Sequence, residues 1–271
     1  MNSDDHLSLP MHFLLSVNEF DNRLIHPISG DKHEKNLLKK SIINIIFGLL
    51  VIVALVLIFN RPIKNKVIGS YQPKVTRQEV AATNRRTQKK SKRHQQNVSY
   101  NFKKVKSLDF ETALRSRLNS QQIEQAGQIL IPKSGIHLPI GLGVSNSTLA
   151  LAAGTMRANQ KMGRGNYPLA GHHMVNRKIL FGPLYFKTRV GQTIYLTDMN
   201  RVYQYQVYQR AFIAATRVDV IKQTKKPIVT LVTCDATGKG RLLIRGRLVK
   251  TFKLRDATQK IKRALLRPAN S

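Results

Sequence analysis

An apolar run from Ile42 to Phe59 is the strongest constraint on how this chain folds. The run, IINIIFGLLVIVALVLIF, has one polar side chain, Asn44, in 18 residues. At about 1.5 Å per residue, a helix of that length nearly spans a hydrocarbon layer of ~30 Å. A helix that is apolar on every face is atypical of a soluble core, and no small-residue cleavage pattern follows Phe59. We therefore expect an uncleaved transmembrane helix over residues 42–59.

The segments on either side of this run are polar, and we expect neither to fold. Residues 1–41 form a predicted N-terminal tail with no assigned function, and residues 60–106 carry 14 Lys or Arg against one acidic residue. That composition predicts a solvated basic linker, which either binds anionic headgroups or wall polymer or serves only as a solubilising spacer. Lysines and arginines flank the apolar run on both sides, so the positive-inside rule assigns no orientation.

Residues 107–271 are the predicted folded domain. Asp109 is the expected cap of a helix that runs to Gln125 and stops at Gly127, and Asp256 is the expected cap of a last helix through Leu266. Between them lie short β-like runs separated by turns rich in Gly, Pro and Asn. Eight such runs favour a mainly β fold, either a sandwich or a closed eight-stranded β-barrel, since closure removes free edges. The runs are Gln128–Ile131, Ile136–Leu138, Thr148–Leu151, Tyr167–Ala170, Thr193–Thr197, Val202–Ala214, Ile228–Thr233 and Arg241–Lys253.

The whole chain is strongly basic, with a formal net charge of +32. A field of that size attracts polyanions, so a membrane-tethered, non-enzymatic binder of polyanions is one hypothesis for its function. The basic excess lies in the linker and across the domain without an aromatic stacking platform, and tryptophan is absent. We therefore do not expect nucleic acid as a partner.

The single cysteine suggests a second, enzymatic hypothesis. Cys234 ends an apolar, β-branched run, and Arg241 opens the next one, in the stretch TLVTCDATGKGRLLIRG from Thr230 to Gly246. This pattern predicts two strands joined by a polar turn, with a thiol at one rim and a guanidinium at the other. A positive charge favours the reactive thiolate. The alternative is a small, buried, unreactive cysteine.

The best candidate for a base is one of two adjacent histidines, His172 and His173, which follow the apolar strand YPLAG. Successive side chains on an extended chain point to opposite sides, so we expect only one of the pair to face Cys234. A surface histidine pair is the plain alternative. Zinc held by both histidines and Cys234 is the weaker idea, because adjacent histidines diverge.

The third member of such a site is better supplied by arginine than by a carboxylate. No acidic residue occurs between Glu124 and Asp198, so a triad would need Asp198, Asp219 or Asp235. The fixed fork of Arg241 can instead hydrogen-bond a scissile carbonyl and stabilise an oxyanion.

These motifs resemble the class A sortases. The match consists of Thr230-Leu231-Val232-Thr233-Cys234, which is similar to the TLxTC signature, with Arg241 on the following strand and Leu169-Ala170-Gly171-His172 as the histidine segment. Further similarity covers roughly residues 125 to 255, in the family's order. It includes Ile131-Pro132, Leu138-Pro139-Ile140, Gly154-Thr155-Met156, Met162-Gly163-Arg164-Gly165-Asn166-Tyr167 and Ile194-Tyr195-Leu196-Thr197-Asp198.

The resemblance implies a closed eight-stranded sortase-type barrel behind a single transmembrane helix, with the catalytic domain outside the cell membrane of a Gram-positive bacterium. By this analogy Cys234 attacks the Thr–Gly bond of an LPXTG-type sorting signal, His172 protonates the leaving amine and Arg241 stabilises the oxyanion. Lipid II or another peptidoglycan amine then accepts the acyl group. The resemblance also implies that Ala170, Val232 and Thr233 line the sorting-signal groove, beneath a loop over residues 218–227.

Two further observations refine this expectation. Some class A members bind calcium through acidic residues in the loop before the histidine strand, whereas this loop carries Arg157, Lys161 and Arg164. We therefore expect neither a metal nor a cofactor. No second hydrophobic span follows Lys250, which counts against a pilus-assembling class C enzyme.

Overall fold

The computed structural model describes residues 31–89, 99–100, 108–234 and 238–269. The chain divides into two compact units, residues 1–56 and 57–271, and each is described by itself. Residues 1–30, most of the predicted tail, lie outside the described residues.

Helix α1 (Asp31–Gly69) contains the whole predicted span 42–59. The apolar side chains of that span are exposed, from 42% for Val51 to 69% for Leu57. Among the described residues, α1 is the one helix long and apolar enough to cross a membrane. It begins earlier than the predicted span because neither Gly nor Pro interrupts residues 31–41.

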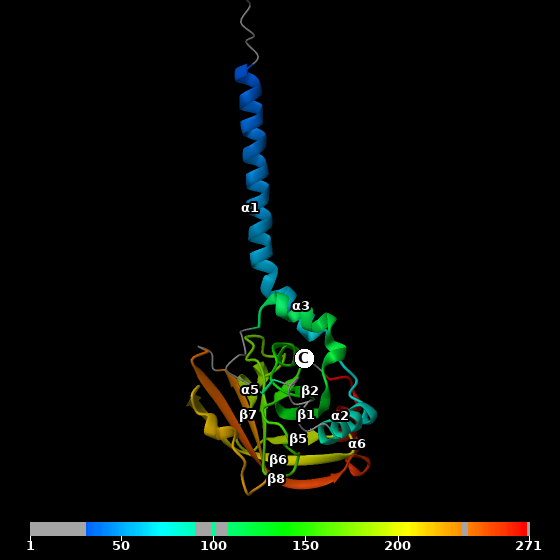
Figure 1. Ribbon diagram of the computed structural model, residues 1–271. Helices are drawn as coiled ribbons and strands as arrows, with labels where there is room; N and C mark the ends of the chain where they lie inside the picture. The colour runs from blue at the N-terminus through cyan, green and yellow to red at the C-terminus, as the bar shows by residue number, and fades with distance from the viewer. Residues whose placement is uncertain (1–30, 90–98, 101–107, 235–237, 270–271) are drawn as a thin grey trace, which may run out of the picture. The chain divides into compact units, whose positions relative to one another are not determined.

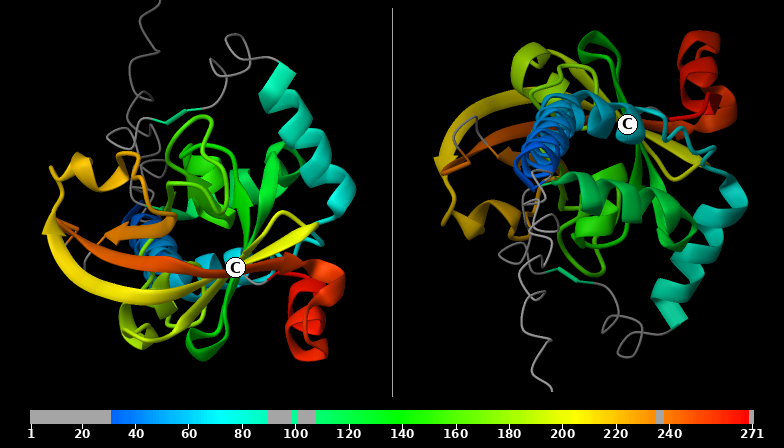
Figure 2. Two further views of the ribbon diagram at one scale, coloured as in Figure 1. Left: turned by 90° about the horizontal axis from the view of Figure 1, so that it is seen from below. Right: turned by 90° about the horizontal axis from the view of Figure 1, so that it is seen from above.

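The second unit is built on a closed β-barrel, which confirms the predicted fold class (Figure 1). The strands follow the order β1-β2-β3-β4-β7-β8-β6-β5 around the barrel, and the long strands β6 and β8 curve side by side (Figure 2). Their bounds are β1 Gln125–Ile131, β2 Ile136–Gly141, β3 Ala153–Thr155, β4 Asn166–Ala170, β5 Thr193–Thr197, β6 Arg201–Ala214, β7 Ile228–Cys234 and β8 Gly240–Lys253.

Period-two alternation along the strands divides the barrel into an inner and an outer face. On β7, Val229 and Leu231 join the main core, together with Leu242 and Ile244 of β8. Val232 instead joins a smaller apolar cluster with Ala170 and Leu243. Residues 230, 232 and 234 of β7 therefore share the outer face, and this places Cys234 outside the core.

Seven of the eight predicted strands are present, and the prediction of a strand over Thr148–Leu151 is wrong. It belongs to helix α4 (Asn146–Leu151), whose N-cap Ser145 accepts a hydrogen bond from Thr148 N at 3.1 Å. The eighth strand is β3, which is three residues long and makes two paired positions with each neighbour. A strand as short as β3 has too few residues to show alternation of apolar and polar side chains, whereas the Ser145 cap stabilises α4, the helix that precedes β3.

The two predicted flanking helices are present with different ends. Asp109 caps α3 (Phe110–Leu118), as expected, but α3 ends at Leu118, and β1 begins at Gln125. The last helix, α6 (Gln259–Leu266), is capped by Thr258 and not by Asp256, which lies in the preceding turn η5 (Leu254–Asp256). The remaining short helices are η2 Ser120–Gln122, η3 Pro132–Ser134, α5 Gly182–Lys187 and η4 Val218–Ile221.

The expectation that residues 60–106 are an unfolded spacer is wrong for a large part of that segment. It contains helix α2 (Arg77–Lys89). Four apolar residues are at least 94% buried, and Ile68 joins the core of the barrel. They are Ile68, Tyr71, Val75 and Val80. A few well-spaced apolar residues therefore anchor a strongly basic segment against the barrel, an effect that average composition conceals.

Candidate active site

The thiol of Cys234 lies at the end of β7, on the outer face of the barrel. It is partly exposed and forms no disulfide. In the antiparallel ladder, Cys234 is paired directly with Arg241 of β8. The turn predicted between the two strands therefore brings the thiol and the guanidinium to one rim.

Two backbone carbonyls orient Arg241 at this rim. Its Nη1 donates to Gly238 O at 3.0 Å and to Gly240 O at 2.8 Å. Gly238 belongs to the β7–β8 connection and Gly240 opens β8, so the guanidinium is held beside the strand end and does not extend freely into solvent. Planar, oriented N–H groups of this kind can bind a carbonyl oxygen and the oxyanion derived from it.

His172 follows the end of β4, the strand that neighbours β7. Strand β4 runs parallel to β7 with Ala170 paired to Val232, and Gly171 N donates to Val232 O at 3.1 Å. His172 is two residues beyond Ala170, and Cys234 is two beyond Val232. The ladder itself ends at Ala170 and Val232; extended by two residues, its register sets His172 level with Cys234 on the same face of the sheet.

The residue before His172 must be small because a phenyl ring packs against the chain there. A Cβ built on Gly171 would lie 2.5 Å from Cδ2 of Phe181. Phe181 N also donates to His172 O at 3.2 Å. The ring and this hydrogen bond fix the direction in which the chain leaves β4 and present the imidazole.

Burial keeps His172 neutral at pH 7. The side chain is 8% exposed, and its Nε2 has no hydrogen-bond partner among the described residues. Burial, with a smaller contribution from the positive charge of Lys64, lowers the pKa of His172 from 6.5 to about 4. A neutral imidazole can accept a proton, which is what a base beside a thiol must do.

His173 has a different environment, as the alternation of side chains predicts. Its ring makes an edge contact with Tyr185, with 4.9 Å between centroids, and a tilted contact with Phe186 at 6.1 Å. Both aromatic residues belong to α5. The structure thus separates the two histidines and brings only His172 to the level of Cys234.

Two of the three predicted groove residues share an outer apolar surface beside the thiol. Ala170 and Val232 belong to one buried cluster, whose other members are Val144, Leu149, Met156, Val220 and Leu243. We call this cluster without Val220 the groove, after the sorting-signal groove that the resemblance implies. Thr233 alternates to the inner face instead, where it is fully buried and its hydroxyl has no hydrogen-bond partner among the described residues.

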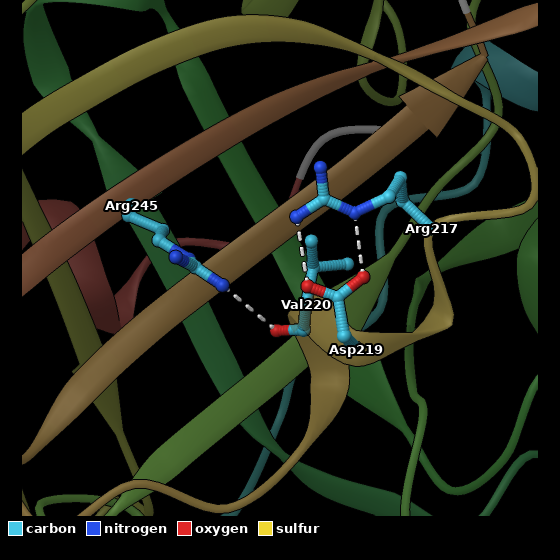
Figure 3. A network of polar contacts seen from close by, with 4 residues as sticks. All are labelled: Arg217, Asp219, Val220 and Arg245. Carbon is cyan, nitrogen blue, oxygen red and sulfur yellow. Dashed lines mark hydrogen bonds and ion pairs between the residues drawn. The ribbon is translucent and has the colours of Figure 1, made fainter.

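The segment 218–223, which we call the roof, packs against the groove through Val220. An ion pair joins Arg217, just before the roof, to Asp219 within it, with Nε–Oδ1 2.7 Å and Nη2–Oδ2 2.8 Å. Arg245 Nη2 donates to Val220 O at 3.3 Å (Figure 3). Sequence reasoning placed a loop here but missed the residues that hold it, because their contacts join segments far apart in the chain.

The candidate triad carboxylates within the described residues are engaged elsewhere. Asp198 accepts hydrogen bonds from Asn200 N, Arg201 N and Tyr203 Oη at 2.7–3.1 Å. Asp219 is paired with Arg217, which lowers the pKa of Asp219 to about 2. Asp235 lies outside the described residues. Among the described charged residues, Arg241 is the one paired with Cys234 in the ladder.

No group of three or more His, Cys, Asp or Glu side chains within the described part of the chain could hold a metal ion. The three basic residues of the loop before β4 line a pocket of about 330 Å³ in which Asp198 is the one carboxylate. These residues are Arg157, Lys161 and Arg164. Such a lining does not suit calcium, which prefers several oxygen ligands.

Known proteins have sequences similar to this chain. A family model described as a sortase domain matches residues 129–249. The chain is 35% identical to sortase A of Streptococcus agalactiae serotype III over 229 residues, which cover 82% of this chain and 90% of that protein. It is 34% identical to sortase A of Listeria monocytogenes serovar 1/2a over 220 residues, which cover 80% and 95%.

Among solved structures, sortase C-3 of Streptococcus pneumoniae aligns with a TM-score of 0.53 at 19% identity. The alignment covers 75% of this chain and 99% of that one, so the two share a fold.

Proposed function

The chain belongs to the sortase family of cysteine transpeptidases, and we propose that it is a class A enzyme that cleaves LPXTG-type sorting signals between Thr and Gly. It then transfers the acyl fragment to an amine of lipid II or another peptidoglycan precursor. One observation supports the proposal most directly: Cys234 pairs with Arg241 at the end of β7, and the neighbouring strand β4, in register with β7, leads into His172 beside a buried apolar cluster.

In the first half of the reaction, neutral His172 accepts the proton of the Cys234 thiol. The thiolate Sγ attacks the carbonyl carbon of the sorting-signal Thr, and the fork of Arg241 stabilises the resulting oxyanion. When the C–N bond breaks, His172 returns its proton to the departing Gly amine. The products are a free Gly-bearing fragment and a thioester on Cys234.

In the second half, the acceptor amine attacks the thioester carbonyl. His172 removes a proton from the attacking nitrogen, the new amide forms, and Cys234 leaves as a thiolate that recovers its proton from His172. Bonds and protons balance over the two halves, so the reaction exchanges one amide for another without an external energy source.

The outer surface at Ala170 and Val232 is suited to the apolar Leu-Pro part of the signal. The acyl fragment must stay bound while the amine leaves and the acceptor enters, so we assign the groove to the LPXT segment. Thr233 contributes through its backbone in this assignment, because its side chain faces inward. Helix α1 serves as the single-pass membrane anchor, with the barrel on the extracellular side.

The test is cleavage of a fluorogenic LPXTG peptide by the full chain in detergent, with and without an added amine. We expect turnover that requires the sequence LPXTG, an amide product when amine is present, and no turnover for Cys234→Ala. Cleavage that survives Cys234→Ala would refute the mechanism. The alternative function, binding of polyanions without catalysis, predicts no turnover and salt-sensitive binding that does not depend on Cys234.

A further inference from the structure

Side chains of the barrel hold the backbone of the roof at three consecutive carbonyls. Val220 O accepts from Asn166 Nδ2 at 2.9 Å and from Arg245 at 3.3 Å. Ile221 O accepts from Arg157 Nη1 at 3.4 Å. Lys222 O accepts from Asn166 Nδ2 at 2.9 Å. Side-chain donors thus take the place of a backbone ladder in this segment.

Asn166 is the centre of this arrangement. Its two Nδ2 hydrogens bind two roof carbonyls, its Oδ1 accepts from Thr230 Oγ1 at 2.7 Å, and its backbone N donates to Gln223 Oε1 at 2.5 Å. The residue is fully buried. A buried amide with all its donors used defines one geometry, because any displacement of the roof leaves polar groups unpaired.

The same residue is joined to the floor of the groove. Asn166 opens β4, the strand that continues to Ala170 and then to His172. It is paired with Ile228 at the start of β7, and its partner Thr230 precedes Val232 on the outer face. One side chain therefore links the floor, formed by β4 and β7, to the roof that covers it.

We propose that Asn166 is a positioning residue that fixes the conformation of the roof over the groove before a sorting signal arrives. Arg245 and Arg157 reinforce the clamp at Val220 and Ile221. This inference rests on the proposed function, in which the groove binds the LPXT segment. A roof that is already ordered costs the ligand no ordering entropy, so the clamp acts on substrate affinity and not on the chemical step.

The experiment compares Asn166→Ala and Asn166→Asp with the parent protein, each as the full chain in detergent. Aspartate can still accept from Thr230 but places oxygens against two carbonyls, so it tests the two Nδ2 donors. We expect KM for an LPXTG peptide to rise about tenfold or more while kcat at saturation stays within about twofold, a tenfold change being ~1.4 kcal/mol.

A second readout does not depend on activity. Lys222 and Lys225 are exposed in and beside the roof, and we expect trypsin to cut after them about tenfold faster in both variants. Alkylation of Cys234 by iodoacetamide should proceed at the parental rate, since the rim is unchanged. Gln223→Ala, which removes only an exposed acceptor, should also raise KM and speed cleavage of the roof, but by less than the Asn166 variants. This variant tests the proposal if the Asn166 variants do not fold.

Asn200→Asp is the matched control, because Asn200 is exposed in the turn between β5 and β6; it should match the parent in every measurement. The proposal is overturned if KM and roof cleavage stay at the parental values in the Asn166 and Gln223 variants. It is also overturned if thermal stability and kcat both fall while KM rises, because that result would indicate a merely structural residue. If the parent cleaves no LPXTG peptide, the proposed function fails, whereas roof cleavage still tests the clamp.

Discussion

Cys234 and Arg241 are direct partners across the antiparallel ladder of β7 and β8. The pairing places a thiol and a guanidinium at one strand end without requiring a long side chain to cross the site. Because the carbonyls of Gly238, in the connection, and Gly240, at the start of β8, accept from Nη1 of Arg241, the backbone sets the orientation of the fork.

Replacing Arg241 by lysine should lower kcat for the LPXTG peptide by about 10²-fold or more. Lysine keeps the charge but loses the planar fork, and removal of one oxyanion donor typically costs about 10²–10³ in kcat. Steady-state kinetics measure the effect. Arg247→Lys, an exposed position on the same strand, is the control and should stay near the parental rate. Near-normal turnover by Arg241→Lys would mean that charge alone suffices.

Thermal stability should fall as the pH drops from about 6.5 towards 4. Burial lowers the pKa of both His172 and His137 to about 4, with smaller effects from Lys64 and Arg267 respectively. As the pH falls, the histidines of the unfolded chain are protonated before those of the folded protein. Their contribution to the free energy of unfolding is therefore fully present above pH 6.5 and decreases as the pH approaches about 4, the pKa in the folded protein. Unfolding followed by circular dichroism should show a weaker pH dependence for His137→Gln. Equal slopes for the variant and the parent would contradict the assignment for His137.

Thr233→Val should stabilise the protein by about 1 kcal/mol. The hydroxyl is fully buried without a hydrogen-bond partner among the described residues, so valine removes an unpaired polar group at nearly constant volume. Chemical denaturation measures the change. Thr197→Val is the matched comparison: that buried hydroxyl donates to Arg201 O at 2.8 Å and accepts from Met199 N at 3.0 Å. Thr197→Val should lower the free energy of unfolding by about 1–3 kcal/mol. If Thr233→Val were the more destabilising of the two changes, the Thr233 hydroxyl would have a hydrogen-bond partner.

A fragment of residues 57–271 should be markedly more stable than one of residues 107–271. The shorter fragment lacks Ile68, Tyr71, Val75 and Val80, which are buried in the longer one. Ile68→Ala in the longer fragment should cost about 2–5 kcal/mol, as for other large-to-small core changes. Melting temperatures check both statements. Equal melting temperatures for the two fragments would restore the view of residues 60–106 as a spacer.

Local sequence patterns were sufficient for much of the fold. The apolar run at 42–59 predicted a helix, and alternation with turn residues predicted seven strands, because both signals come from neighbours in the chain. The same patterns failed at Thr148–Leu151, where a serine cap stabilises a helix turn, and at residues 60–106. There the stabilisation comes from burying four separated side chains against elements far away in sequence.

By itself, the sequence determined the chemistry available to this protein: one thiol, a histidine pair, an arginine seven residues after the thiol, and no carboxylate in the long stretch around the histidines. Only the tertiary structure decided which groups meet. The register of β4 on β7 brings His172, and not His173, to the level of Cys234, and the clamp at Asn166 joins positions more than 50 residues apart. The reason is physical: side-chain identity is local, whereas register and hydrogen bonding across the barrel depend on how the whole sheet closes.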